Sequence, residues 1–129
     1  MRFADLGDRR VAVLGFGAEG RAACRAFRRH RPTQALHLFC NSAESEEARA
    51  LNDAQLTIDT TAATAAALSA FDVVIKSPGV SPYQPPVSDA LAAGVSFTSG
   101  SALWFAEHPD ANTIVFSLTI TALSASSTR

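Results

Sequence analysis

Val11-Ala-Val-Leu-Gly-Phe-Gly-Ala-Glu-Gly20 is the stretch that decides the fold. Its apolar start belongs to a strand predicted over 10–14, and such a short apolar run is typical of a strand buried on both faces. The glycines then form a G-x-G-x-x-G pattern that opens a helix predicted over 18–30. There Gly15 permits a tight turn, Gly17 lets the backbone approach a ligand, and Gly20 allows close packing of helix on strand.

The beginning of that helix has backbone amides without partners inside the helix, and these amides favour a phosphate. The glycine pattern therefore predicts either an anion-binding loop or a purely structural turn. On the outer face of the same helix, the arginines between Arg21 and Arg31 are expected to be mostly in solvent.

Strands and helices alternate along the rest of the chain. Strands are predicted at 35–39, 55–59, 71–75, 95–98 and 113–116, and helices at 42–51, 61–69, 87–93 and 102–107. Short connections of this kind imply right-handed crossovers. We therefore expect an α/β fold over residues 1–115, with a Rossmann-like, doubly wound, mostly parallel sheet of about five strands. Residues 116–129 form an atypical tail.

Composition excludes several classes of protein. The chain has 129 residues, of which 47% are hydrophobic, so it is not wholly disordered. Its net charge of -1 argues against a nucleic-acid partner. No secretory signal begins the sequence, and the apolar run 113–123 is too short to cross a membrane. Cys24 and Cys40 form no C-x-x-C pair, so we expect reduced thiols, no metal site, no membrane insertion and a cytoplasmic location.

The residues at the end of the strand predicted at 35–39 indicate which kind of nucleotide could bind. NAD needs an acid at the end of this strand, but the sequence there is Phe39-Cys-Asn-Ser42 and the nearest acid is Glu44. A small NAD(P)-binding regulatory module is therefore the alternative prediction, and a nucleoside diphosphate is the better one. Asn41 either pairs with a base such as uracil or caps the helix that follows.

A second loop rich in small residues follows the strand predicted at 71–75. It reads Lys76-Ser-Pro-Gly-Val-Ser-Pro82 and is expected at the carboxyl edge of the sheet, beside the glycine loop. The amide of Gly79 and the hydroxyl of Ser77 could then bind a phosphate, and Lys76 could supply a positive charge. The other reading is an ordinary loop with a solvated lysine.

Together, Val11–Gly20 and Val73-Val-Ile-Lys-Ser-Pro-Gly-Val80 resemble the N-terminal domain of the Mur ligases, over residues 5–115. With Lys76–Tyr83 and Ala102–His108, the chain looks most similar to the branch that adds L-glutamate to UDP-N-acetylmuramoyl-L-alanine in peptidoglycan biosynthesis. The resemblance implies that the chain binds the UDP part of this substrate.

By the same resemblance, specific residues are expected around the ligand. Those along the diphosphate and the uracil are Gly17, Ala18, Glu19 and Gly20; those at the uracil ring are Cys40, Asn41 and Ser42; those of the loop closing on the diphosphate are Ser77 and Gly79.

Mur ligases continue into a P-loop, a central ATPase domain and a glutamate-binding domain, and they use ATP and Mg²⁺. Here residues 117–129 contain no Gly and no Lys. The resemblance therefore implies a ligase chain truncated or frameshifted before its P-loop, without catalytic residues, metal or cofactor of its own and lacking its partner domains. A relic that folds poorly without those domains is a third possibility.

Overall fold

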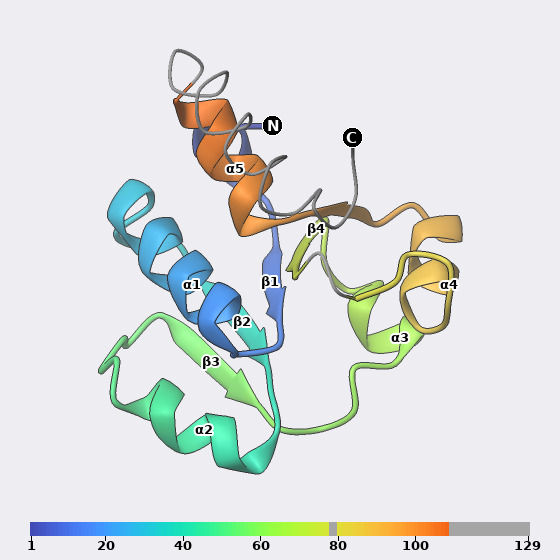
Figure 1. Cartoon of the computed structure of the whole chain (residues 1–129), viewed down its shortest axis with the longest axis horizontal. Coiled ribbons are helices and arrows are strands. Elements are labelled where there is room, and N and C mark those ends of the chain that lie inside the picture. The colour runs from blue at the N-terminus through green and yellow to red at the C-terminus, as the bar shows by residue number, and fades with distance from the viewer. Residues whose placement is uncertain (78–79, 109–129) are drawn as a thin grey trace, which may run out of the picture.

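The computed structural model describes residues 1–77 and 80–108. Its centre is a five-stranded, wholly parallel sheet with the strand order β3-β2-β1-β4-β5 (Figure 1). The strands are β1 (Val11–Leu14), β2 (Leu36–Phe39), β3 (Leu56–Asp59), β4 (Val73–Lys76) and β5 (Ser96–Thr98). The Rossmann-like prediction is thereby confirmed. The strand predicted at 113–116 and the tail 116–129 lie outside the described residues.

Helices connect the strands. They are a 3-10 turn η1 (Phe3–Leu6) and the α-helices α1 (Ala18–His30), α2 (Ser42–Arg49), α3 (Ala65–Leu68), α4 (Val87–Ala92) and α5 (Gly100–Glu107). Two predicted helix starts were wrong because side-chain caps place them elsewhere. The Thr64 hydroxyl accepts from the Ala67 amide at 3.1 Å, so the third helix begins after residue 64 rather than at 61. Ser99 accepts from the Ala102 amide at 3.0 Å, so α5 begins at residue 100 rather than at 102.

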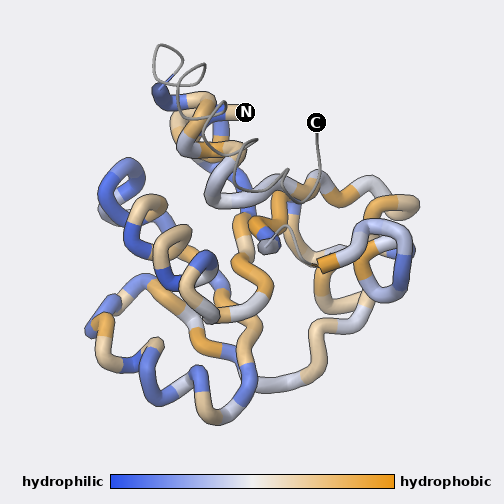
Figure 2. The backbone as a smooth tube through the Cα atoms, viewed as in Figure 1, coloured by the Kyte–Doolittle hydropathy of each residue, from blue (hydrophilic) through white to orange (hydrophobic). Residues whose placement is uncertain are grey.

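Successive residues of a strand point to opposite faces of the sheet, and a separate hydrophobic core lies on each face. Val11 and Val13 of β1 point to the face covered by α1, α2 and α5, and Ala12 points to the face covered by α3 and α4. The first core holds the larger share of the buried side chains, Phe27 and Leu103 among them. Figure 2 shows hydrophobic residues along the strands and hydrophilic ones along the outer sides of α1 and α2.

The arginines of α1 were predicted to be mostly in solvent, but Arg28 is largely buried. The Arg28 guanidinium donates to the Asp53 carboxylate at 2.8 Å and to the carbonyl oxygens of Arg31 and Gln34 at 2.8 and 2.7 Å. Its side chain is only 21% exposed. These bonds tie the end of α1 to the segment that enters β3, so the helix is anchored at a point far along the chain.

Asp59, at the end of β3, is held by neighbours on both oxygens. Oδ1 accepts from the hydroxyl and the amide of Thr61, and Oδ2 lies 2.9 Å from Nε2 of His37. The hydrogen bonds from Thr61 come first among the causes that lower the pKa of Asp59 from 3.8 to about 2. The ionised carboxylate therefore stabilises the folded state, fully above its ordinary pKa and progressively less as the pH falls through about 2.

We expect Asp59→Asn to lower the free energy of unfolding by about 1 kcal/mol at pH 6, because it removes a charged acceptor. The difference from the parent chain should shrink between pH 4 and pH 2, where the parent carboxylate is also neutralised. Urea unfolding across this pH range measures both effects. Glu46→Gln removes an exposed charge and serves as control; an Asp59→Asn deficit that is independent of pH would contradict the prediction.

Candidate functional site

Three loops leave the sheet side by side at its carboxyl edge. In the strand register Leu14 pairs with Phe39 on one side and with Lys76 on the other. The Gly15 amide also donates to the Phe39 carbonyl oxygen at 2.7 Å, which ties the glycine loop to the end of β2. The structure therefore brings the glycine loop, the segment at Asn41 and the loop at Lys76 together, as the sequence predicts.

Two of the three glycines of the loop, Gly15 and Gly20, have the steric reason expected of them. Gly15 has φ +92°, in the region that side chains disfavour. A Cβ on Gly20 would lie 2.0 Å from the carbonyl oxygen of Gly15, so α1 packs against the loop too closely for any side chain. A Cβ on Gly17 would meet nothing within 4 Å, so the space above the loop is open.

The first turn of α1 differs from those of three other helices. Side chains of Asn41, Thr64 and Ser99 accept hydrogen bonds from the first turns of α2, α3 and α5. The N-cap of α1 is Gly17, which has no side chain to do this. The first amides of α1 thus face the carboxyl edge without a side-chain acceptor, an arrangement suited to an external anion.

Asn41 is a helix cap. Its Oδ1 accepts from the Glu44 amide at 2.7 Å, and its own amide donates to the Glu44 carboxylate at 3.1 Å, which makes a reciprocal capping box. The capping alternative of the two predicted for Asn41 is confirmed. A contact between its side-chain NH₂ group and a base remains a prediction.

Asn41→Ala is expected to lower the free energy of unfolding by about 1 kcal/mol, because the first turn of α2 loses its acceptor. Asn41→Asp is the matched control: a carboxylate caps equally well and is favoured by the helix dipole, so stability should be retained. Chemical denaturation of the two variants distinguishes them. Equal stability of the alanine and aspartate variants would contradict a capping role.

A small cavity lies between the start of α1, directly after the glycine loop, and the loop that begins at Lys76. Glu19 and Gly20 of α1 line it together with Lys76, Ser77 and Gly100. Pro78 and Gly79 lie outside the described residues, so the predicted role of Gly79 is not tested. Gly100, at the start of α5, did not figure in the sequence prediction. Its signal was the run of small residues Ser99-Gly-Ser101 directly after β5, which matches the pattern of a helix start.

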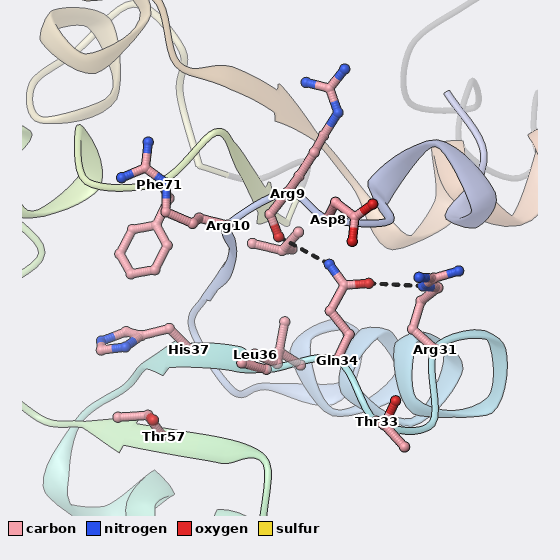
Figure 3. Close-up of a pocket in the computed structure, with 12 residues that line it drawn as sticks. Asp8, Arg9, Arg10, Arg31, Thr33, Gln34, Leu36, His37, Thr57 and Phe71 are labelled. Carbon is pink, nitrogen blue, oxygen red and sulfur yellow. Dashed lines mark hydrogen bonds between the residues drawn. The ribbon is translucent and has the colours of Figure 1, made fainter.

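A larger cavity of about 540 Å³ lies at the opposite, amino edge of the sheet (Figure 3). Two of its polar side chains, Gln34 and Arg31, are hydrogen-bonded to each other. The Gln34 side chain donates to the carbonyl oxygens of Leu6 and Arg9 at 2.7 and 2.9 Å, and accepts from Arg31 at 2.8 Å. This network fastens the entrance of β1 to the end of α1, which is a structural role.

Neither metal ligands nor membrane-spanning segments emerge from the described residues. Over 1–77 and 80–108, no three His, Cys, Asp or Glu side chains gather so as to hold a metal ion. No helix in this part of the chain combines the length and the apolar character needed to cross a membrane. The two cysteines are both free and buried, and burial raises the pKa of the Cys24 thiol to about 12.

A parallel sheet in this strand order, with a glycine loop leading into a helix that lacks a side-chain cap, defines a Rossmann-like domain of the kind that binds nucleotides at its carboxyl edge. Residues 9–99 match the family model of the Mur ligase MurD-like N-terminal domain. The chain belongs to this family.

Relatives of this chain carry the name UDP-N-acetylmuramoyl-L-alanine--L-glutamate ligase. One from Xanthomonas euvesicatoria is 52% identical over 112 residues, which are 87% of this chain and 24% of that protein. One from Xylella fastidiosa is 51% identical over 115 residues, 89% of this chain and 24% of the relative. A more distant one from Salinispora tropica is 38% identical over 109 residues, 84% and 24% of the two chains. The chain thus spans about a quarter of the length of these relatives.

Proposed function

We propose that the chain binds UDP-N-acetylmuramoyl-L-alanine at the carboxyl edge of its sheet, as the N-terminal domain of a cytoplasmic L-glutamate-adding ligase of peptidoglycan biosynthesis. The observation that carries the proposal is the first turn of α1, which lacks a side-chain cap and lies beside Lys76 and Ser77. Membership of the MurD-like family supports the choice of ligand, as do the names of the relatives.

In this proposal the diphosphate lies against the amides of Ala18, Glu19 and Gly20. The positive end of the α1 dipole attracts it, and the open space above Gly17 lets it approach the backbone. Lys76 and Ser77, at the end of the neighbouring strand, add a cation and a hydroxyl donor. Gly15 shapes the turn, and Gly79 is assigned to the diphosphate by resemblance.

The uridine would extend toward the end of β2, where Asn41 could offer its side-chain NH₂ group to the uracil ring. The NAD(P) alternative is disfavoured at this place. The residues that follow β2 are Cys40 and Asn41, neither of them an acid. The nearest carboxylate, that of Glu44, accepts from the Asn41 amide in the capping box of α2, so it is already engaged and does not take the place of the acid that holds the two ribose hydroxyls of a dinucleotide.

Ligation itself would need more than the residues described. ATP and Mg²⁺ are assigned by resemblance to other domains of the ligase, and residues 1–77 and 80–108 bring together no metal-binding group. We therefore assign substrate binding to this chain and no catalytic residue, with the remaining ligase domains as its partners in catalysis.

Calorimetric titration of residues 1–129 with UDP-N-acetylmuramoyl-L-alanine tests the proposal, with UDP and NADH as comparators. Lys76→Met should weaken binding of both uridine nucleotides about tenfold, equivalent to about 1.4 kcal/mol. Arg25→Met removes an exposed charge from the outer side of α1 and should leave binding unchanged. Gly79→Val should also weaken binding. Tighter binding of NADH than of the uridine nucleotides would overturn the proposal.

A further inference from the structure

A cavity of about 610 Å³ opens between the second half of α1 and the connection from α2 to β3. Three arginines of α1, Arg25, Arg28 and Arg29, form one of its walls. Among the described residues, Asp53 supplies the single carboxylate of the lining, and Arg28 already binds it at 2.8 Å. The lining side chains therefore carry an excess of positive charge, and we call this site the arginine cavity.

Two of the three arginines have no counter-charge. Arg25 and Arg29 are both exposed and stand four residues apart, so they lie on the same side of α1, where like charges repel each other. One turn earlier the charge is balanced, because Arg21 lies 2.7 Å from Glu47. Within residues 1–77 and 80–108, neither Arg25 nor Arg29 takes part in an ion pair. An anion placed between them would remove the repulsion.

The third arginine holds a fixed charge at the base of the cavity. Nε and Nη1 of Arg28 make the three hydrogen bonds described above, whereas Nη2 is buried and has no partner in the part of the chain that the structure describes. A buried donor of this kind has lost its water without gaining an acceptor. The guanidinium is thus largely desolvated before any ligand arrives, and its attraction for a negative group is screened less than that of a fully hydrated arginine.

The other walls of the cavity are uncharged. Apolar surface comes from Cys24, Pro32, Leu51 and Ala54, and amide groups come from Asn52 and Gln55. Leu51 packs against the core but is only partly buried, so some of its surface is left for a ligand. The volume is also far greater than an inorganic ion needs, since a water molecule occupies about 30 Å³ in the liquid. The walls therefore suit an acidic group that is joined to an apolar body.

We propose that the arginine cavity binds a small organic anion. Its carboxylate or phosphate lies between Arg25 and Arg29, and its apolar part lies against Leu51 and Pro32. Charge-assisted hydrogen bonds to two guanidinium groups provide the affinity for the acidic group, and burial of the apolar part adds to it.

The arginine cavity is separate from the proposed nucleotide site. Arg28 stands ten residues after Ala18, the first residue of α1, which corresponds to about 15 Å along the helix. The nucleotide is assigned to the first turn of α1 and the organic anion to the second half of the same helix. The two ligands can therefore bind at the same time, and this proposal does not depend on the proposed function.

Titration of the isotope-labelled full chain with phenyl phosphate, followed by two-dimensional NMR, tests the proposal. The amide signals of residues 51–55 should shift and reach saturation. Signals of residues 15–20 report on the proposed nucleotide site and are fitted separately, so that failure of one proposal is distinguishable from failure of the other. Inorganic phosphate, which lacks the apolar body, should bind at 51–55 more weakly, and benzyl alcohol, which lacks the charge, should cause no saturable shift there.

Arg25→Gln with Arg29→Gln should weaken the binding reported by residues 51–55 about tenfold or more. Arg2→Gln with Arg9→Gln is the matched control, because it removes the same charge from two exposed arginines outside the cavity, and it should change the affinity by less than about twofold. Ala54→Glu places a carboxylate at an exposed position of the lining and should also weaken binding, although all three arginines remain.

Three results would overturn the proposal. Equal weakening by the two glutamine pairs would show attraction to the overall positive charge rather than to this cavity. Inorganic phosphate that binds as tightly as phenyl phosphate would show that the apolar walls take no part. Phenyl phosphate shifts that do not saturate at residues 51–55 would show that no site exists there.

Discussion

Gly20→Ala is expected to destabilise the domain by about 3 kcal/mol and to abolish binding of UDP-N-acetylmuramoyl-L-alanine. The added Cβ would stand 2.0 Å from the Gly15 carbonyl oxygen, a backbone atom with no freedom to turn aside, so either α1 or the glycine loop must shift. A shift of either one moves the α1 amides away from the proposed diphosphate position. Urea unfolding and calorimetric titration measure the two losses separately.

Gly17→Ala is the matched control for this prediction. The methyl group meets no atom within 4 Å, and the φ of -75° at Gly17 is accessible to alanine, so the fold should be retained. If the diphosphate approaches the backbone here, affinity falls although stability does not. Parent-like stability of Gly20→Ala would show that the close contact between α1 and the loop does not exist in solution.

Phe27→Ala is expected to lower the free energy of unfolding by about 3–5 kcal/mol. The ring is fully buried, with 0% exposure, in the core between α1 and the sheet. Truncation removes apolar contacts and leaves a cavity that the parallel strands cannot close by moving individually. The midpoint and slope of urea unfolding, followed by circular dichroism, provide the measurement.

Arg25→Ala, two residues earlier on the exposed side of α1, is the control and should change stability by less than about 0.5 kcal/mol. The loss of unfolding free energy for Phe27→Leu should lie between the losses for Phe27→Ala and Arg25→Ala, because leucine keeps most of the volume of the phenylalanine side chain. A loss below about 1 kcal/mol for Phe27→Ala would contradict the tight packing of α1 on the sheet.

Much of the architecture was predictable from local patterns. The apolar run before Gly15 and the alternation of strands and helices led to a Rossmann-like sheet, and the structure confirms it with five parallel strands. Strand and helix periodicity is a property of neighbouring residues, so it can be recognised in the sequence alone. Helix starts were predicted less well. Thr64 and Ser99 decide where α3 and α5 begin, and several Ser and Thr residues nearby were equally plausible caps.

The candidate site was predictable in part. Glycine spacing indicated the turn at Gly15 and the close approach at Gly20, because both follow from backbone sterics within a few residues. The sequence left two roles open for Asn41, helix capping and contact with a base, and its hydrogen bonds with Glu44 confirm the capping role. Gly100 was not recognised, since it reaches the cavity only through packing of α5 against α1.

By itself the sequence determined the fold class, the glycine turn and the family, because these depend on local periodicity and on motifs of a few residues. Only the tertiary structure decided that Arg28 is held by Asp53 rather than by solvent, and that Trp104 stays exposed beside a groove. These features depend on contacts between residues far apart in the chain. Their free energy arises from packing and desolvation in the assembled core, which no local pattern contains.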